Sequence, residues 1–174
     1  MRKFTDEHTF FIADTHFSHK NIIRYENRPF HSLAGMDKQL IKNWNKKITN
    51  NDRIFLVGDF SFGNKDQQRE IAQKLNGYKI LIMGNHDNYS MEHYQEIGFA
   101  EVCRYPIVLN NFWFVSHRPL FLDLPYVNIF GHVHSNPAFA DFSPQSICVS
   151  VERKHMNYSP ISLEEIKQLT GTAP

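Results

Sequence analysis

Short apolar runs of the kind that form buried β-strands recur along the whole chain. Several of them are apolar throughout rather than alternating, which is typical of strands buried on both faces of a sheet. The predicted strands cover residues 9–13, 53–57, 79–83, 112–115, 127–130 and 146–151. A shorter run over 107–109 precedes Asn110-Asn111, a pair that favours a hairpin turn into the strand at 112–115.

Helical periodicity fills part of the sequence between these strands. Apolar residues three and four positions apart predict helices over residues 36–48, 65–75, 90–97 and 162–169. Strands and helices alternate in the early part of the chain, whereas the later part is mostly β. This order predicts the α/β (α+β) class with mixed sheets. A length of 174 residues without a Gly, Ser or Pro linker predicts one domain over residues 1–174.

The composition disfavours several classes of protein. Nineteen basic and 18 acidic residues give a net charge of +1, so no stable nucleic-acid partner held by charge is expected. No stretch approaches the ~18 apolar residues of a membrane helix, and the first residues do not resemble a secretory signal. The two cysteines, Cys103 and Cys148, make no disulfide framework. We therefore expect a cytoplasmic protein without a membrane partner, whose ten histidines point to imidazole chemistry.

Side chains that bind metal ions stand directly after five of the predicted strands. In open α/β sheets, sites form in the loops beyond the carboxyl ends of strands, so these side chains are expected to converge. The seven candidate ligands are Asp14, His16, Asp59, Asn85, His117, His132 and His134. Asp14 and His16 are two positions apart, as are His132 and His134, and an extended backbone would point both members of each pair the same way.

Seven candidate ligands exceed the needs of one tetrahedral ion but suit two ions that share a carboxylate. Imidazole, carboxylate and amide groups suit Zn, Fe or Mn, and the lack of thiolate disfavours a structural zinc finger. Two divalent ions, two aspartates and a bridging hydroxide leave a net charge of about +1, which attracts phosphate. Two ions roughly 3.5–4 Å apart can activate a water and clamp a transferring phosphoryl group.

The five segments resemble the motifs of the calcineurin-like metallophosphoesterase superfamily, whose order is D-x-H, G-D, G-N-H-[DE], H and G-H-x-H. The corresponding segments here are Asp14-Thr15-His16, Gly58-Asp59, Gly84-Asn85-His86-Asp87, His117 and Gly131-His132-Val133-His134. Five motifs in order are far more specific than any one of them. The stretch over residues 14–30 is also similar to small bacterial and phage members. The resemblance implies a four-layer sandwich of two mixed β-sheets flanked by helices.

The resemblance also implies a role for each matching residue. Asp14, His16 and His134 would hold the first ion, Asn85, His117 and His132 the second, and Asp59 would bridge the two. His86 would contact the phosphate and protonate the leaving oxygen as a general acid, and Asp87 would orient His86. The implied enzyme is a dinuclear metal-dependent phosphoesterase that cleaves small phosphodiesters, such as nucleotides, by means of a metal-bridging hydroxide. Mn is the favoured ion among Mn, Fe, Zn and Ni.

Three further residues are candidates for binding the substrate: His19, Arg28 and Arg118. His19 could instead lie in the first turn of a short helix over residues 21–26, and Arg28 could lie on the surface. Asp87 could cap the helix that follows it.

The remaining histidines and one apolar loop are expected to be structural. His8, His31, His93 and His155 fit ordinary surface or helix positions. The apolar loop over residues 121–126 is expected to pack in the core, with a substrate-facing lip or an oligomer contact as alternatives.

Other functions are also compatible with the motifs. The same centre could act as a phosphomonoesterase on small substrates, or the fold could be a metal-binding scaffold with little catalytic activity. A scaffold would be expected to have lost ligands or the acid, whereas all of them are present. A nuclease would need a basic track for the phosphate backbone, which a net charge of +1 does not indicate.

Overall fold

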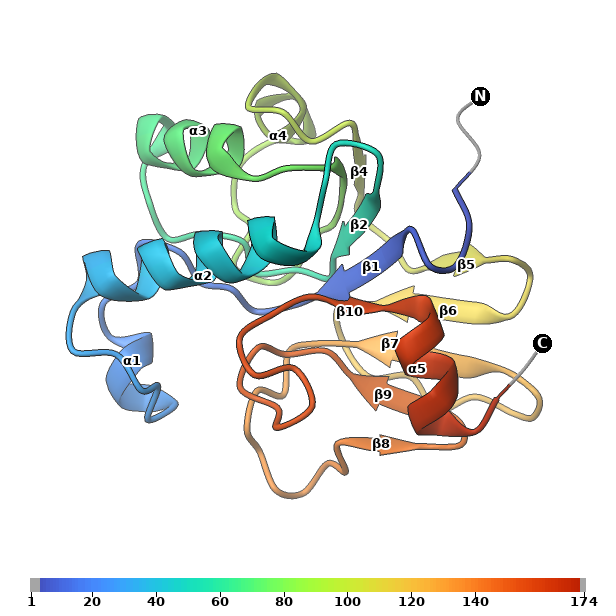
Figure 1. Ribbon diagram of the computed structural model, residues 1–174. Helices are drawn as coiled ribbons and strands as arrows, with labels where there is room; N and C mark the ends of the chain where they lie inside the picture. Colours follow the sequence, from blue (N-terminus) through green and yellow to red (C-terminus); the bar gives the residue numbers. More distant parts are fainter. Residues whose placement is uncertain (1–3, 173–174) are drawn as a thin grey trace.

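The first of two β-sheets is mostly parallel and contains the strands of the N-terminal half of the chain. A computed structural model describes residues 4–172, and Figure 1 shows their arrangement. In this sheet β1 to β4 run parallel, and β10 pairs with β1 in the antiparallel direction at one edge. In spatial order the strands are β10 (Ile161–Ser162), β1 (Thr9–Ile12), β2 (Arg53–Leu56), β3 (Tyr78–Ile82) and β4 (Glu101–Cys103).

The second sheet is mixed and has a parallel centre with antiparallel edges. β6 and β7 pair in parallel, as do β7 and β9, whereas β5 and β8 each pair antiparallel with a neighbour. In spatial order the strands are β5 (Ile107–Leu109), β6 (Trp113–Ser116), β7 (Val127–Phe130), β9 (Ser146–Cys148) and β8 (Phe142–Ser143). The prediction of two mixed sheets is therefore confirmed.

Side-chain caps begin four of the helices in the described part of the chain. Ser32, Asn64, Ser90 and Ser162 each accept a hydrogen bond from a backbone N–H one turn further on, and Asn64 and Ser162 form complete capping boxes. The helices are α1 (Ile22–Tyr25), α2 (Leu33–Lys47), α3 (Lys65–Lys74), α4 (Met91–Glu96) and α5 (Leu163–Thr170).

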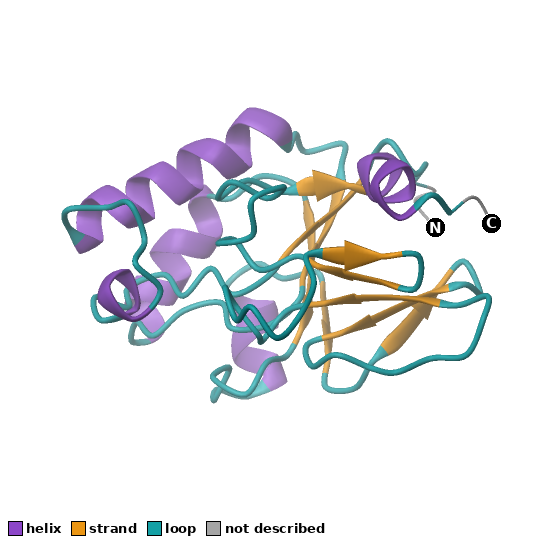
Figure 2. Cartoon of the chain, turned by 90° about the horizontal axis from the view of Figure 1, so that it is seen from below, coloured by secondary structure: helices purple, strands orange, loops and turns teal. Residues whose placement is uncertain are grey.

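The helices cover the two sheets unequally. Figure 2 shows most of the helices grouped on one side of the strands, with α5 lying apart from them near the two termini. α5 contacts β1 and β10 of the first sheet and also β8 and β9 of the second. Residues from both sheets and from α2 form a continuous apolar core, which includes Phe11, Trp44, Phe55, Trp113 and Ile129.

The two sheets are joined at the end where β1 stops. The backbone N–H of Ala13 donates to the carbonyl of Val149 at 2.8 Å, and Val151 N–H donates back to Ala13 at 3.2 Å. Val149 N–H also donates to the carbonyl of Phe130, at the end of β7. This junction brings the carboxyl ends of strands from both sheets to one place.

Most predicted elements are present, and the three strands that were not predicted lie at sheet edges. The hairpin turn is present, because Asn110 and Asn111 have φ of 52° and 55°, as a type I′ turn requires. α2 begins at Leu33, earlier than predicted, because Ser32 caps it. The unpredicted strands β4, β8 and β10 have two or three residues each, too few to show a pattern.

The expectation that the loop over residues 121–126 packs in the core is wrong. Phe121 is 97% exposed and Leu124 is 76% exposed, and Tyr126 is also exposed. The loop joins β6 to its parallel neighbour β7, so it must return along the outside of the second sheet rather than within the core. Among the described helices, none has the length and apolar character needed to cross a membrane.

Candidate metal centre

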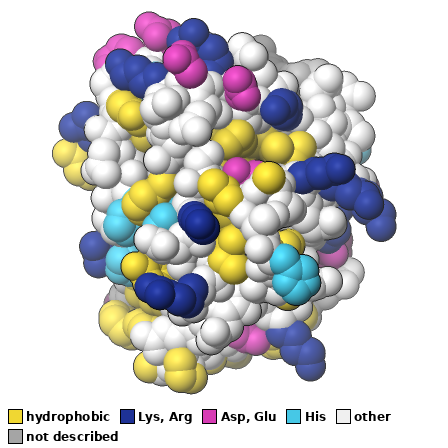
Figure 3. Space-filling model, turned by 90° about the vertical axis from the view of Figure 1, so that its left-hand side faces the viewer, with side chains coloured by type: hydrophobic (Ala, Val, Ile, Leu, Met, Phe, Trp, Pro, Cys, Tyr) yellow, Lys and Arg dark blue, Asp and Glu magenta, His cyan; other side chains and the backbone are white. Residues whose placement is uncertain are grey.

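The candidate ligands converge at the edge where the strands of both sheets end. They follow β1, β2 and β3 in the first sheet and β6 and β7 in the second. Figure 3 shows the left-hand side of Figure 1, with histidine side chains exposed on this face and Lys or Arg side chains beside them. Strand ends of two sheets therefore build one site, as the topological rule for such folds predicts.

Four residues form a compact group of potential ligands. Asp14, His16, Asp59 and His134 each place one ligand atom within 4.8 Å of all the others. The Nε2 atoms of His16 and His134 lie 3.3 Å apart, and His16 Nε2 lies 3.5 Å from Asp59 Oδ2. Asp14 Oδ2 accepts hydrogen bonds from Ser150 and from the His132 backbone, whereas its buried Oδ1 has no hydrogen-bond partner in the described chain. An unpaired buried carboxylate oxygen among imidazoles fits a bound cation.

A second group lies on the other side of Asp59. Asp59 Oδ2 is 3.6 Å from His117 Nε2, which in turn is 2.9 Å from Asn85 Oδ1. His117 Nδ1 lies 3.0 Å from the carbonyl of Val57, so it donates there and Nε2 keeps its lone pair. The ring of His132 is 5.0 Å from that of His117. Two lone-pair donors 2.9 Å apart beside a carboxylate again fit a cation.

The backbone at these residues is left-handed, not extended. Positive φ values, between 47° and 70°, occur at Asp14, His16, Asp59, His132 and His134. The expected extended geometry of the two pairs is therefore wrong, and sharp turns bring the side chains together instead. Left-handed backbone costs non-glycine residues roughly 1–2 kcal/mol each, so the fold holds these residues in place against local preference.

Two glycines make room for the ligands. A Cβ at Gly84 would overlap the carboxylate and the backbone N of Asp59, and a Cβ at Gly58 would overlap the His117 ring. Gly58 also has φ of 87°, which side chains rarely allow. These glycines permit a backbone approach that no other residue would allow.

Burial sets the protonation of the imidazoles and of Asp14. Burial lowers the pKa of His16 far below its usual value and lowers the pKa of His132 to about 4, so both rings are neutral at pH 7. Burial raises the pKa of Asp14 to about 6. Burial also lowers the pKa of His134. The hydrogen bond to Glu152 and the charges of Asp14 and Glu152 outweigh this effect and raise the pKa of His134 to about 9. Because neutral imidazoles are the form that binds metal, His16 and His132 are ready to bind, whereas an ion would have to displace a proton from His134.

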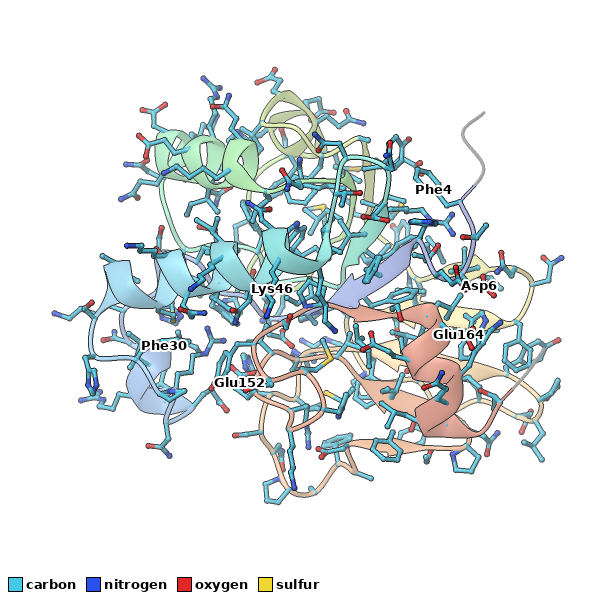
Figure 4. The ribbon with its side chains drawn as sticks, viewed as in Figure 1. Phe4, Asp6, Phe30, Lys46, Glu152 and Glu164 are labelled. Atoms are coloured by element: carbon cyan, nitrogen blue, oxygen red, sulfur yellow. The ribbon has the colours of Figure 1, made fainter. Side chains whose placement is uncertain are left out.

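Arg28 is neither a surface residue nor free to bind substrate, which corrects both expectations. Its guanidinium is fully buried and donates to Glu152 and to the carbonyls of Asp14 and Thr15. Glu152 also accepts a hydrogen bond of 3.1 Å from His134 Nδ1. Figure 4 labels Glu152 on the segment that follows β9. Arg28 is therefore a positioning residue behind His134, because its hydrogen bonds point inward.

Glu152 lies outside the motifs and was not among the predicted site residues, although the sequence carries a signal for it. Glu152 directly follows the strand predicted at residues 146–151, just as the candidate ligands follow theirs. Its Oε1 lies between Arg28 and His134, so it fixes the ring orientation and leaves His134 Nε2 facing His16. Glu152 is the structural counterpart of the carboxylate that commonly supports a metal-binding histidine.

Asp87 binds backbone rather than His86 in the described structure. Its carboxylate accepts N–H groups from Asp59, Phe60 and Gly84, at 2.8, 2.9 and 2.8 Å. It does not cap α4, because Ser90 caps that helix instead. Burial raises its pKa, and these backbone hydrogen bonds oppose that shift. Asp87 thus ties together the two loops that carry Asp59 and Asn85.

His86 and His19 both lie against Phe62 at the mouth of the site. His86 is exposed, its backbone N–H donates to Asp59 Oδ1 at 2.9 Å, and its ring centre lies 5.6 Å from that of His16. The ring of His19 stacks on Phe62 at 3.9 Å, and His19 precedes α1 rather than lying in it. Phe62, 44% exposed, was not singled out from the sequence.

Arg118 lies at the site, whereas the remaining histidines do not. Arg118 Nη1 is 2.9 Å from His132 Nε2 and donates to it. His8 pairs with Asp52 at the surface, and His31 is exposed. His93 lies in α4, as expected, but it is buried and bonded to Gln68. His155 is half-buried and bonds the carbonyl of Cys148.

Comparison with known proteins defines the family. A family model described as calcineurin-like phosphoesterase matches residues 8–137. An uncharacterised protein of Methanocaldococcus jannaschii is 34% identical over 167 residues, which cover 92% of this chain and 89% of that protein. The chain therefore belongs to the calcineurin-like phosphoesterase family, whose members are metal-dependent phosphoester hydrolases.

Two solved structures are similar to this chain. A protein of unknown function from Aquifex aeolicus has a TM-score of 0.70 and 29% identity, covering 92% of this chain and 98% of that one. A Pseudomonas putida nuclease has a TM-score of 0.48 and 19% identity, covering 74% of this chain and 62% of the nuclease. The Aquifex structure supports the same fold over nearly the whole chain.

Proposed function

We propose that the protein is a dinuclear phosphodiesterase that hydrolyses small phosphodiesters such as nucleotide esters. The observation that carries this proposal is the central place of one carboxylate oxygen. Asp59 Oδ2 lies 3.5 Å from His16 Nε2 and 3.6 Å from His117 Nε2. A carboxylate between two groups of imidazoles suits a pair of divalent ions better than a single one.

The donor set divides between two ions. Asp14, His16 and His134 would hold one ion, Asn85, His117 and His132 would hold the other, and Asp59 would be shared. The carboxylate and amide oxygens suit Mn, the imidazoles suit Zn, Fe or Ni, and Mn remains the favoured ion of this proposal. When bound, such a pair supplies an activated water and offsets the charge of the phosphate.

The chain itself supplies the acid and the positioning groups. His86 is exposed at the mouth of the site and close to His16, where its ring can give a proton to the departing oxygen. Arg118 presents a guanidinium beside His132, which suits a phosphate oxygen. Asp87 fixes the loops that carry Asp59 and Asn85, and Glu152 with Arg28 fixes His134.

Two cavities that adjoin different ligands of the centre favour a diester over a monoester. One, of about 660 Å³, is lined by His132 and His134, and another, of about 350 Å³, by Asn85 and His117. A diester carries a substituent on each side of phosphorus, whereas a monoester needs space on one side only. A cytoplasmic setting without a stable nucleic-acid partner also belongs to this proposal.

The test is hydrolysis of bis(p-nitrophenyl) phosphate and of p-nitrophenyl phosphate in parallel. Chelated protein is assayed alone and with Mn²⁺, beside the variant His86→Ala and the control His31→Ala, which alters an exposed histidine. We expect Mn²⁺-dependent cleavage of the diester, reduced roughly 10²–10⁴-fold in kcat by His86→Ala and unchanged by the control. Cleavage of the monoester alone would instead identify a phosphomonoesterase. No turnover, with two ions bound, would favour a scaffold.

A further inference from the structure

The cavity of about 350 Å³ beside Asn85 and His117 has walls that hydrolysis of a simple diester does not require. Arg104 and Tyr105, which follow β4, line one part of it, and Arg118, which follows β6, lines another. The cavity thus lies between the two sheets' strand ends and opens next to the candidate centre. Its volume is within the range of small-molecule sites, ~300–1,000 Å³.

The wall of this cavity is cationic. Two guanidinium groups line it, and among the described residues no aspartate or glutamate does, whereas the larger cavity near His134 includes Glu26. Arg104 is exposed and lies near the exposed Glu92, so the attraction between the two charges is weak and the guanidinium can move towards a ligand. Arg118 donates one hydrogen bond to His132 and keeps further donors free. A guanidinium group in a wall without a carboxylate favours a phosphate, which it can bind in a bidentate manner.

The rest of the lining suits a nucleoside. Tyr105 is 78% exposed, so one face of its ring is open to solvent at the rim. Exposed aromatic rings of this kind stack on nucleobases. Ile82, Met83 and Leu120 supply an apolar floor.

We propose that this cavity is a subsite for a second phosphate of a nucleotide substrate, carried on the other side of the nucleoside from the scissile ester. Arg104 binds that second phosphate, Tyr105 stacks on the nucleoside, and Arg118, beside His132, lies between this subsite and the candidate centre. The substrate class is therefore nucleoside 3′,5′-bisphosphate esters, in which the candidate centre takes one phosphoryl group and the cavity takes the other. The inference rests on the proposed phosphodiesterase activity for its turnover readout, but not for its binding readout.

The turnover experiment uses two esters that differ only in the second phosphate. They are thymidine 5′-(p-nitrophenyl phosphate) and the same ester with a 3′-phosphate, assayed with Mn²⁺-loaded protein. We expect the 3′-phosphate to raise kcat/KM by roughly tenfold or more, in line with a charge-assisted hydrogen-bond pair. Arg104→Gln should lower this preference to near one, and Tyr105→Ala should weaken binding of both esters. Arg69→Gln on α3, which removes the same charge elsewhere, should leave the preference intact.

Binding is measured separately, by calorimetry with thymidine 3′,5′-bisphosphate and thymidine 5′-monophosphate. The bisphosphate should bind roughly tenfold more tightly, and Arg104→Gln should remove that difference. If neither ester is cleaved but the bisphosphate still binds in an Arg104-dependent way, the proposed hydrolysis fails and the subsite stands. Equal binding and equal turnover of the paired compounds by the unaltered protein, or a preference that survives Arg104→Gln, would overturn the subsite.

Discussion

The two halves of the candidate centre differ in burial, in charge and in what supports them. The half built by Asp14, His16 and His134 is largely buried and is backed by the Arg28–Glu152 pair. The half built by Asn85, His117 and His132 offers an amide and two imidazoles, and Asn85 is exposed. Its support comes from the carbonyl of Val57, whereas the exposed Arg118 occupies the Nε2 lone pair of His132 and would move aside for an ion bound there.

This difference indicates that the halves have different tasks. Two carboxylates, Asp14 and Asp59, concentrate negative charge on the buried half, so a cation is favoured there. The open half adjoins both the cationic cavity and the exposed side chain of Arg118, where a phosphate arrives. We interpret the buried half as the tightly held ion site and the open half as the one nearer the substrate. Asp59 joins them, so substitutions in each half and at Asp59 test the assignment.

The largest effect is expected from Asp59→Asn, which removes the shared carboxylate. Because both halves lose a ligand, turnover of a diester should fall at least roughly 10³-fold, and ion content should fall as well. The measurement is kcat/KM together with metal content after dialysis. Asp66→Asn, on the exposed side of α3, is the matched control. Two ions retained at full affinity in Asp59→Asn would show that Asp59 is not shared.

The next effect concerns Asp14 and the pH dependence of stability without metal. Burial raises the folded-state pKa of Asp14 to about 6, so its contribution to stability is fully present below pH ~4 and is lost as pH rises through 6. Asp14→Asn removes this ionisation. The difference in the free energy of unfolding, variant minus wild type, should therefore rise between pH 4 and pH 8 by up to about 3 kcal/mol. Urea unfolding of chelated protein measures this, and a difference that is independent of pH would show that Asp14 is not the titrating group.

Glu152→Gln should act on the buried half alone. The amide can still accept a hydrogen bond but carries no charge, so it holds His134 less strongly and leaves Arg28 buried without its counter-charge, and Tm should fall. Affinity for the tighter ion should drop roughly 10–100-fold, as for other supports of ligating histidines. The control Glu164→Gln alters an exposed carboxylate on α5. A further variant, Arg28→Met with Glu152→Gln, should recover part of the Tm, whereas additive losses would argue against a coupled pair.

The smallest effect is a difference in affinity between the two ions. Titration of chelated protein with Mn²⁺ should give two steps separated by roughly tenfold or more, because only one half carries an unshared carboxylate. His16→Ala should remove the tighter step, and His117→Ala the weaker one. Isothermal titration calorimetry of the wild type and the two variants distinguishes the two binding steps. If His117→Ala removed the tighter step, the assignment of the two halves would be reversed.

The sequence predicted the convergence of the candidate ligands better than it predicted their backbone conformation. All seven follow apolar strands, and strand ends converge in such sheets, so the pattern alone placed His16 and His117 near Asp59. The left-handed backbone at Asp14 and His132 could not be predicted, because contacts between loops impose it against local preference. The same holds for Asp87, whose three backbone partners lie in two loops.

The other features that could not be predicted are a long-range ion pair and the short strands at the edges of the sheets. Arg28 and Glu152 are 124 positions apart and lie outside the five ligand motifs, so no spacing in the sequence indicates their contact. Arg28 before a proline favoured a surface position, but a buried carboxylate draws it inward. The edge strands β8 and β10, with two residues each, are set by pairing with β9 and β1 rather than by their own sequence.

Anomalous X-ray diffraction from crystals of the Mn²⁺-loaded protein would show most directly whether Asp59 joins two ions. We expect two manganese peaks roughly 3.5–4 Å apart, with the Asp59 carboxylate in contact with both. The buried peak should touch Asp14, His16 and His134, and the open one Asn85, His117 and His132. A single peak, or a pair of which only one contacts Asp59, would contradict a centre organised around a shared carboxylate.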